Sequence, residues 1–143
     1  MSRLSRPSMC SLLSALVLGL AACGEGTTTD PGDGDGHEHD AAVASGATCT
    51  PGSTLTAQNF GSDFMTRYCL TCHSVTKQGA ARGGAPADHN YDTVADVRRW
   101  ASEIDKHAAA GPSSVNVLMP PALPRPTQPE REQLGVWLAC GAP

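Results

Sequence analysis

The sequence predicts a small all-α domain over residues 47–143, and three observations support this. Three stretches of the region place apolar side chains three or four residues apart, which is the spacing of one helix face. Each stretch has its own start signal. No stretch alternates apolar and polar residues as a half-buried strand does. The region is long enough for one domain, but with few aromatic side chains its apolar core is marginal, so we expect a further stabilising element.

The first predicted helix begins near Ala57. Phe60, Phe64 and Tyr68 then follow at intervals of four, which places the three rings on one face. We expect this helix to run into residues 69–73.

The second helix is predicted to follow Thr93, since Asp96 stands three residues later and completes a capping box. The apolar stripe of this helix consists of Val94, Val97, Trp100, Ala101, Ile104 and Ala108. Gly111 and Pro112 mark its expected end.

The third helix closes the domain. Thr127 and Glu130 repeat the capping spacing, and Pro129 stands early in the helix, where its missing N–H costs little. Leu134, Trp137 and Leu138 share one face, and Gly141 ends the helix.

Residues 1–22 have the pattern of a signal peptide. Two arginines precede an apolar run at 12–20, which is too short to span a bilayer. Residues 20–23 resemble a lipobox, which predicts acylation of Cys23 and a lipid anchor; a plain secretory signal is the alternative. We therefore expect a bacterial cell-envelope protein whose domain faces the periplasm. Gly24 is not the Asp that retains some lipoproteins at the inner membrane, which favours the outer membrane.

Residues 23–46, which start at the acylated cysteine, are rich in glycine and acid and are expected to form a flexible tether. Its His and Asp residues could chelate a metal ion, although segments of this kind are usually solvated linkers. Residues 47–143 carry eight acidic and eight basic residues and are near neutral. This balance gives no basic patch for nucleic acid and no strong field toward a partner of either charge.

Cys69, Cys72 and His73 form the Cys-x-x-Cys-His sequence of covalent c-type haem attachment. Both thiols would form thioethers with the porphyrin, and the imidazole would bind the iron from the same turn. A zinc site would need about four ligands, and the chain has no second Cys-x-x-Cys and no His-x-x-x-His pair. A redox dithiol remains as a second alternative, without the βαβ pattern that usually surrounds one. One motif predicts one haem.

Two further cysteines, Cys49 and Cys140, stand at the two ends of the domain. They remain once Cys10 leaves with the signal peptide and the other three are assigned to lipid and haem. An exported protein meets an oxidising compartment, so we predict a disulfide between them, with two free thiols as the alternative.

Residues 47–143 resemble the class I (mono-haem) cytochrome c domain. Besides the haem motif, Gly61 with Phe64 and Leu134 with Trp137 are similar to the residues through which that family's terminal helices pack together. Residues 83–86, Gly-Gly-Ala-Pro, are similar to the loop whose carbonyl holds the proximal histidine, which implies that role for Pro86. The resemblance implies a cytochrome c-like fold of about three helices wrapped around one haem.

Residues 118–121, Leu-Met-Pro-Pro, resemble the family's distal loop, which implies that the sulfur of Met119 is the sixth iron ligand. Met65 is interpreted as a core residue, and His89 and His107 are alternative distal ligands. His/Met coordination predicts an electron carrier that serves redox partner proteins and is not an enzyme. Together with the lipid anchor on Cys23, it predicts a carrier that is tethered to a membrane. A gas or redox sensor and a haem peroxidase, each with a displaceable distal ligand, are the alternatives.

Overall fold

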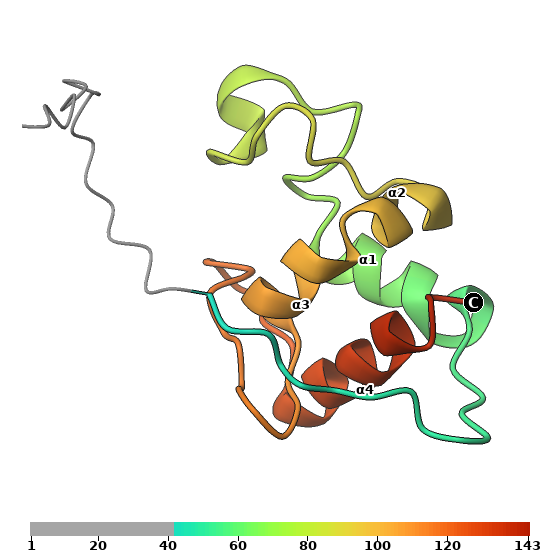
Figure 1. The fold of residues 1–143 in the computed structure, drawn as a ribbon. Helices are drawn as coiled ribbons and strands as arrows, with labels where there is room; N and C mark the ends of the chain where they lie inside the picture. Colours follow the sequence, from blue (N-terminus) through green and yellow to red (C-terminus); the bar gives the residue numbers. More distant parts are fainter. Residues whose placement is uncertain (1–41) are drawn as a thin grey trace, which may run out of the picture. The chain divides into compact units, whose positions relative to one another are not determined.

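The computed structural model describes residues 42–143, and this part of the chain is helical. Its elements in order are η1 (Ala57–Gly61), α1 (Ser62–Tyr68), η2 (Gly79–Arg82), α2 (Val94–Arg99), α3 (Ala101–Ala108) and α4 (Gln128–Ala139) (Figure 1). The described residues contain no strand, only one isolated bridge between Ala110 and Val115. The all-α prediction is thus confirmed for this region. The predicted signal peptide, Cys23 and residues 24–41 of the tether lie outside the described residues.

The first helix begins at Ala57, as predicted, because Thr56 and Asn59 cap each other. It opens with the π-helical turn η1 and continues as α1 to Tyr68. The prediction that it runs into the haem motif is wrong. Cys69 is the C-cap, and the N–H groups of Cys72 and His73 both bond back to its carbonyl, at 3.2 and 2.9 Å. The motif therefore lies on turns that follow the helix.

The second predicted helix is two helices, α2 and α3, which meet at Trp100. The capping box of Thr93 and Asp96 is present as predicted. The backbone of Trp100 leaves helical geometry, with φ −104° and ψ 12°, and its ring stacks on His89, with ring centroids 3.8 Å apart. The break therefore coincides with a side-chain contact to the segment that follows the haem motif.

Helix α4 begins with the predicted capping box of Thr127 and Glu130 and buries Leu134, Trp137 and Leu138. These side chains complete a core with residues from the other helices, among them Phe64, Met65, Val97 and Ile104. Trp137 packs against the start of the first helix, where it meets Phe60 edge-on at 5.9 Å. The contact between the first and last helices that the sequence predicted is therefore present.

No helix among residues 42–143 is long and apolar enough to cross a membrane.

Cys49 and Cys140 form the predicted disulfide. The folded unit begins before this bridge, because Ser45 is fully buried and its hydroxyl donates to a carboxylate oxygen of Asp105 at 2.5 Å. The Ser45 backbone N–H donates to the other oxygen of the same carboxylate at 2.8 Å. The prediction that the tether extends to Gly46 is therefore wrong at its C-terminal end.

Candidate haem-binding site

A cavity of about 380 Å³ lies among the residues that follow α1, helix α3 and the loop before α4. Its volume is within the range of about 300–1,000 Å³ that ligand sites occupy. All the residues that the sequence assigned to haem binding line this one cavity: Cys69, Cys72, His73, Pro86 and Met119. Segments that are far apart in the chain thus meet here. Apolar side chains such as Phe64, Ile104 and Ala108 complete the wall.

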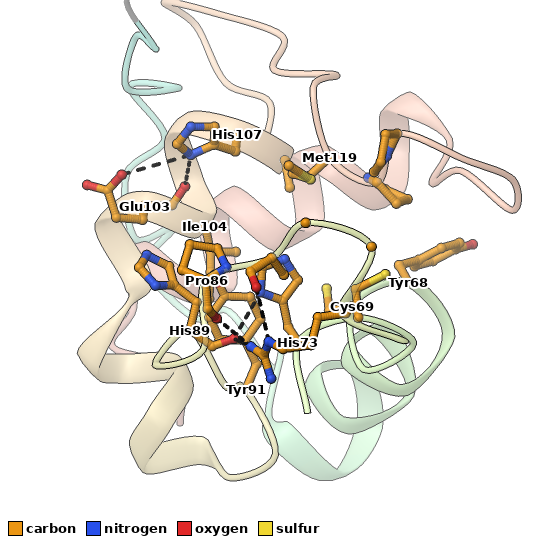
Figure 2. A pocket seen from close by; sticks show the side chains of 18 of the residues that line it. Tyr68, Cys69, His73, Pro86, His89, Tyr91, Glu103, Ile104, His107 and Met119 are labelled. Carbon is orange, nitrogen blue, oxygen red and sulfur yellow. Dashed lines mark hydrogen bonds and ion pairs between the residues drawn. The ribbon is translucent and has the colours of Figure 1, made fainter. Parts of the chain in front are cut away.

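The two predicted iron ligands lie at different ends of the cavity (Figure 2). Met119 lies beside His107 at the end formed by α3 and the following loop, whereas His73 lies with Cys69 and Tyr91 at the other end. A planar group between the two ends would have one ligand on each side.

The ring of His73 is held in place from two directions. Its Nδ1 lies 2.9 Å from the carbonyl oxygen of His89, and the ring stacks on Tyr91 with centroids 4.5 Å apart. Because a carbonyl oxygen can only accept, Nδ1 carries the proton, and Nε2 of the neutral ring keeps its lone pair. Burial lowers the pKa of His73, which favours this neutral form. The imidazole is thus in the tautomer that a metal ion binds through Nε2.

The role assigned to Pro86 is corrected by this contact. The carbonyl that accepts from His73 belongs to His89, three residues farther along the chain. The Pro86 carbonyl instead accepts from Nη2 of Arg82 at 2.5 Å, while Pro86 itself still lines the cavity. The loop is longer than the resemblance implied, because η2 and the turn after it precede the residue that reaches Nδ1.

Cys69 and Cys72 are free thiols that line the cavity. Burial raises the pKa of the Cys69 thiol to about 12, whereas the reactive cysteine of a dithiol redox pair normally has a lowered pKa. Gly83 lies close to the second thiol: its φ of +58° suits glycine, and a Cβ there would be 3.1 Å from the sulfur of Cys72. The raised pKa of Cys69 is unlike that of a reactive redox cysteine.

Met119 is fixed through its backbone, while its side chain stays partly accessible. Its N–H donates to the carbonyl of His107 at 2.9 Å, and its own carbonyl accepts from Arg131 at 2.9 Å. The residue is 37% exposed, whereas Met65 is 4% exposed and belongs to the core, as predicted.

The two histidines considered as alternative ligands lie at different ends of the cavity wall. His89 belongs to the His73 end, where its ring stacks on Trp100 and its Nδ1 lies 2.9 Å from Asp88. His107 lies beside Met119, and its Nδ1 lies 2.7 Å from the carbonyl of Glu103. Of the two, only His107 is placed where it could compete with Met119.

Sequence reasoning missed Tyr91 and the buried Arg82, which line the cavity, and the buried Arg131, which donates to the Met119 carbonyl. Arg82 is 6% exposed and Arg131 is 2% exposed, and both donate to main-chain carbonyls. A signal for Arg131 was available: it stands three residues before Leu134, on the face of α4 that the apolar residues bury. No comparable pattern marks Arg82, which lies between Ala81 and Gly83.

Among residues 42–143 no three His, Cys, Asp or Glu side chains gather in a way that could hold a metal ion. Haem iron takes only two protein ligands, so this finding leaves the haem prediction untested. Comparisons with protein-family models, with curated proteins and with solved structures found no match to this chain.

Proposed function

We propose that this chain is a mono-haem c-type cytochrome that transfers single electrons through an iron ligated by His73 and Met119. The observation that carries the proposal is the shared cavity: the two thiols, the imidazole and the thioether come from distant segments and line one cavity. The same arrangement supports the finer proposal of a cytochrome c-like fold wrapped around the haem. The packing of the first helix against Trp137 is a second, independent likeness to that family.

The residues present suit a covalently bound haem. Cys69 and Cys72 carry free thiols that could form the two thioethers, and His73 offers an unprotonated Nε2. When bound, the haem would supply a one-electron ferric/ferrous couple. Met119 would contribute a neutral, polarisable sulfur, and His/Met coordination favours the reduced state compared with two histidines.

The protein around the cavity would keep the iron six-coordinate and dry. Apolar side chains of α1 and α3 line the space, and the hydrogen bond from His73 to the His89 carbonyl fixes the imidazole orientation. If His73 and Met119 both held the iron, a substrate would find no open ligand position, so we propose a carrier and no enzyme.

We further propose that a lipid on Cys23 anchors the carrier to a membrane of the bacterial envelope, with the domain facing the periplasm and the outer membrane favoured. Its partners would be redox proteins. The near-neutral domain charge supports neither nucleic acid nor a strongly charged partner.

A haem-based gas or redox sensor, or a peroxidase, is the second candidate. The observation in its favour is that Met119 is 37% exposed and sits on a loop beside His107. A ligand at such a position could be displaced and admit a small molecule to the iron.

The test is to produce the chain together with a haem-attachment system and to record its mass and optical spectra. Covalent attachment adds the mass of one haem and is lost when both Cys69 and Cys72 are replaced by alanine. In the ferric state, a Met-to-iron bond gives a long-wavelength band, and a filled sixth position excludes carbon monoxide in the ferrous state. Met119→Ala should lose the band and admit the gas, while the matched variant His107→Ala should do neither.

Other outcomes select other functions. Carbon monoxide binding by the unaltered protein would favour the sensor or the peroxidase. Loss of native spectra in His107→Ala, with Met119→Ala unaffected, would make His107 the distal ligand. Absence of covalent haem would overturn the proposal and leave a zinc or dithiol lipoprotein.

A further inference from the structure

We propose that the two buried arginines are positioning residues for the two iron ligands, with Arg82 serving His73 and Arg131 serving Met119. The inference rests on the proposed function, since it concerns how the same cavity sets its chemistry.

Arg82 organises the loop that follows the haem motif. Its guanidinium donates to the carbonyls of Ser74 at 3.0 Å, Ala85 at 3.0 Å and His89 at 3.0 Å, and to the side-chain oxygen of Asn90 at 2.9 Å. Residues 74–90 contain only the four-residue helix η2, and the backbone hydrogen bonds among them are short-range turn contacts. A planar fork with five N–H donors is suited to gathering several carbonyls around one point.

The contact that links Arg82 to the iron ligand is a shared acceptor. The carbonyl oxygen of His89 accepts from Nη2 of Arg82 at 3.0 Å and from Nδ1 of His73 at 2.9 Å. A cationic donor on that oxygen makes it a weaker acceptor for His73. The imidazole then carries less negative character, which disfavours the more positive ferric iron. The charge of the guanidinium acts in the same direction, so both effects raise the reduction potential.

Arg131 fixes the other ligand through the main chain. Its Nη1 donates to the carbonyls of Ala108 at 2.7 Å, Asn116 at 2.8 Å and Met119 at 2.9 Å. One nitrogen on α4 therefore ties the end of α3 to both halves of the loop that carries Met119. Since the Met119 N–H is also bonded, to His107, the backbone on both sides of the sulfur-bearing residue is held.

Neither Arg82 nor Arg131 forms an ion pair with a carboxylate in the described part of the chain, where the ion pairs involve other side chains. A buried cation bonded only to neutral acceptors is costly unless every donor is well placed. We infer that the two charges are kept for their effect on the site and do not serve packing alone.

The experiment uses the haem-loaded full chain and four variants, Arg82→Met, Arg82→Lys, Arg131→Met and Arg131→Lys. The matched control is Arg67→Met, which also removes one positive charge, from an exposed arginine that is paired with Asp63. The measurements are the midpoint potential, the long-wavelength Met-to-iron band and carbon monoxide binding by the ferrous protein.

For Arg82→Met we expect the band to persist and the ferrous-to-ferric equilibrium to shift at least tenfold toward ferric, which is a fall of about 59 mV for one electron. The midpoint potential of Arg82→Lys should fall less, because lysine keeps the positive charge but lacks the planar fork of donors that reaches the His89 carbonyl. Arg131→Met should lose the band and bind carbon monoxide. Arg131→Lys should keep the band, because an ammonium nitrogen carries three N–H donors, one for each of the three carbonyls.

Equal potentials for Arg82→Met and Arg67→Met would overturn the role of Arg82. A full band and no gas binding in Arg131→Met would overturn the role of Arg131. If a methionine variant fails to retain haem, the lysine variants test the proposal instead. Arg82→Lys must then have a lower midpoint potential than the unaltered protein, and Arg131→Lys must keep the Met-to-iron band. An unchanged potential or a lost band would refute the role of the arginine concerned. Failure of the proposed function is distinct, because it would already be seen in the unaltered protein as absent haem or an absent band.

Discussion

Gly61 and Trp137 pack so closely that a Cβ atom on Gly61 would overlap the indole ring. This contact brings the start of the first helix onto the last one, and it leaves no room for a larger residue. The backbone of Gly61 is helical, with φ −60° and ψ −48°, so steric conflict and not backbone conformation selects glycine here.

We therefore predict that Gly61→Ala lowers the free energy of unfolding by about 1–3 kcal/mol through overpacking. Alanine has the better helix propensity, by about 1 kcal/mol, and the clash is expected to outweigh that gain. Denaturant unfolding measures the change, with the neighbouring exposed Ser62→Ala as control, for which we expect no more than about 0.5 kcal/mol. A stabilised Gly61→Ala would show that the helices can separate at no cost.

The disulfide between Cys49 and Cys140 closes a loop with a sequence separation of 91. On the chain-entropy model a loop of that length contributes about 4–5 kcal/mol, so replacing both cysteines by serine should lower the free energy of unfolding by up to that amount. The measurement is denaturant unfolding with and without reductant. Reductant should destabilise the unaltered protein and leave the double variant unchanged; an equal response of both would contradict the prediction.

The three helical stretches that begin after a threonine cap were predictable because each carries its own local signals, whereas the short helix η2 was not predicted. Thr56, Thr93 and Thr127 cap the helices that follow them, and the apolar spacing after each one marks the face that is buried. The break at Trp100 was not predictable, since the apolar stripe continues through it and the break coincides with a stacking contact to His89, a residue outside the helix. Local patterns identify helices, while tertiary contacts decide where they bend.

The candidate site was predictable where chemistry dictates residue type. Cys69, Cys72 and His73 form a motif, and Met119 stands in a recognisable loop. The hydrogen-bond acceptor for the His73 ring was not predictable, because it is a backbone carbonyl, which every residue has. For the same reason the role of Arg82 could not be read from the sequence, since almost all its partners are main-chain oxygens.

The hydrogen bonds between Ser45 and Asp105 predict that residues just before Gly46 stabilise the domain. Ser45→Ala removes a buried hydroxyl that donates to a carboxylate, so we expect a loss of about 1–3 kcal/mol in the free energy of unfolding. Ser102→Ala, on the exposed face of α3, is the control. Equal stability of the two variants would mean that residues before Gly46 belong to the tether after all.

Acid should weaken the start of α4 through Glu130. The hydrogen bonds that its carboxylate accepts from the backbone N–H and the hydroxyl of Thr127 hold its pKa below the ordinary value of 4.5, although partial burial opposes them. Because the pKa is lowered in the folded state, this contribution is complete above 4.5 and is lost as the pH falls through the folded-state pKa.

Glu130→Gln keeps a side-chain oxygen that can accept the same hydrogen bonds but removes the negative charge at the helix N-terminus, so it should lower the free energy of unfolding at neutral pH by about 0.3–1 kcal/mol. It should also flatten the acid dependence of stability below pH 4.5. Unfolding curves across that pH range measure both effects. Glu132→Gln, about one turn farther along α4 on its exposed face, is the control and should keep the full acid dependence of stability. The same flattening in this variant would mean that the effect comes from the overall loss of negative charge and not from the cap.

Replacing Met65 should change mainly the stability of the protein, whereas replacing Met119 should change mainly its optical spectrum. Met65 is 4% exposed in the core, so Met65→Ala should lower the free energy of unfolding by about 2–5 kcal/mol while the Met-to-iron band of the haem-loaded protein persists. Met119→Ala should abolish the band and cost less stability, because the residue is 37% exposed and fills no core space. Unfolding curves and ferric spectra of both variants test this. Loss of the band in Met65→Ala alone would reverse the assignment, since a sulfur packed between α1 and the core would then have to reach the iron.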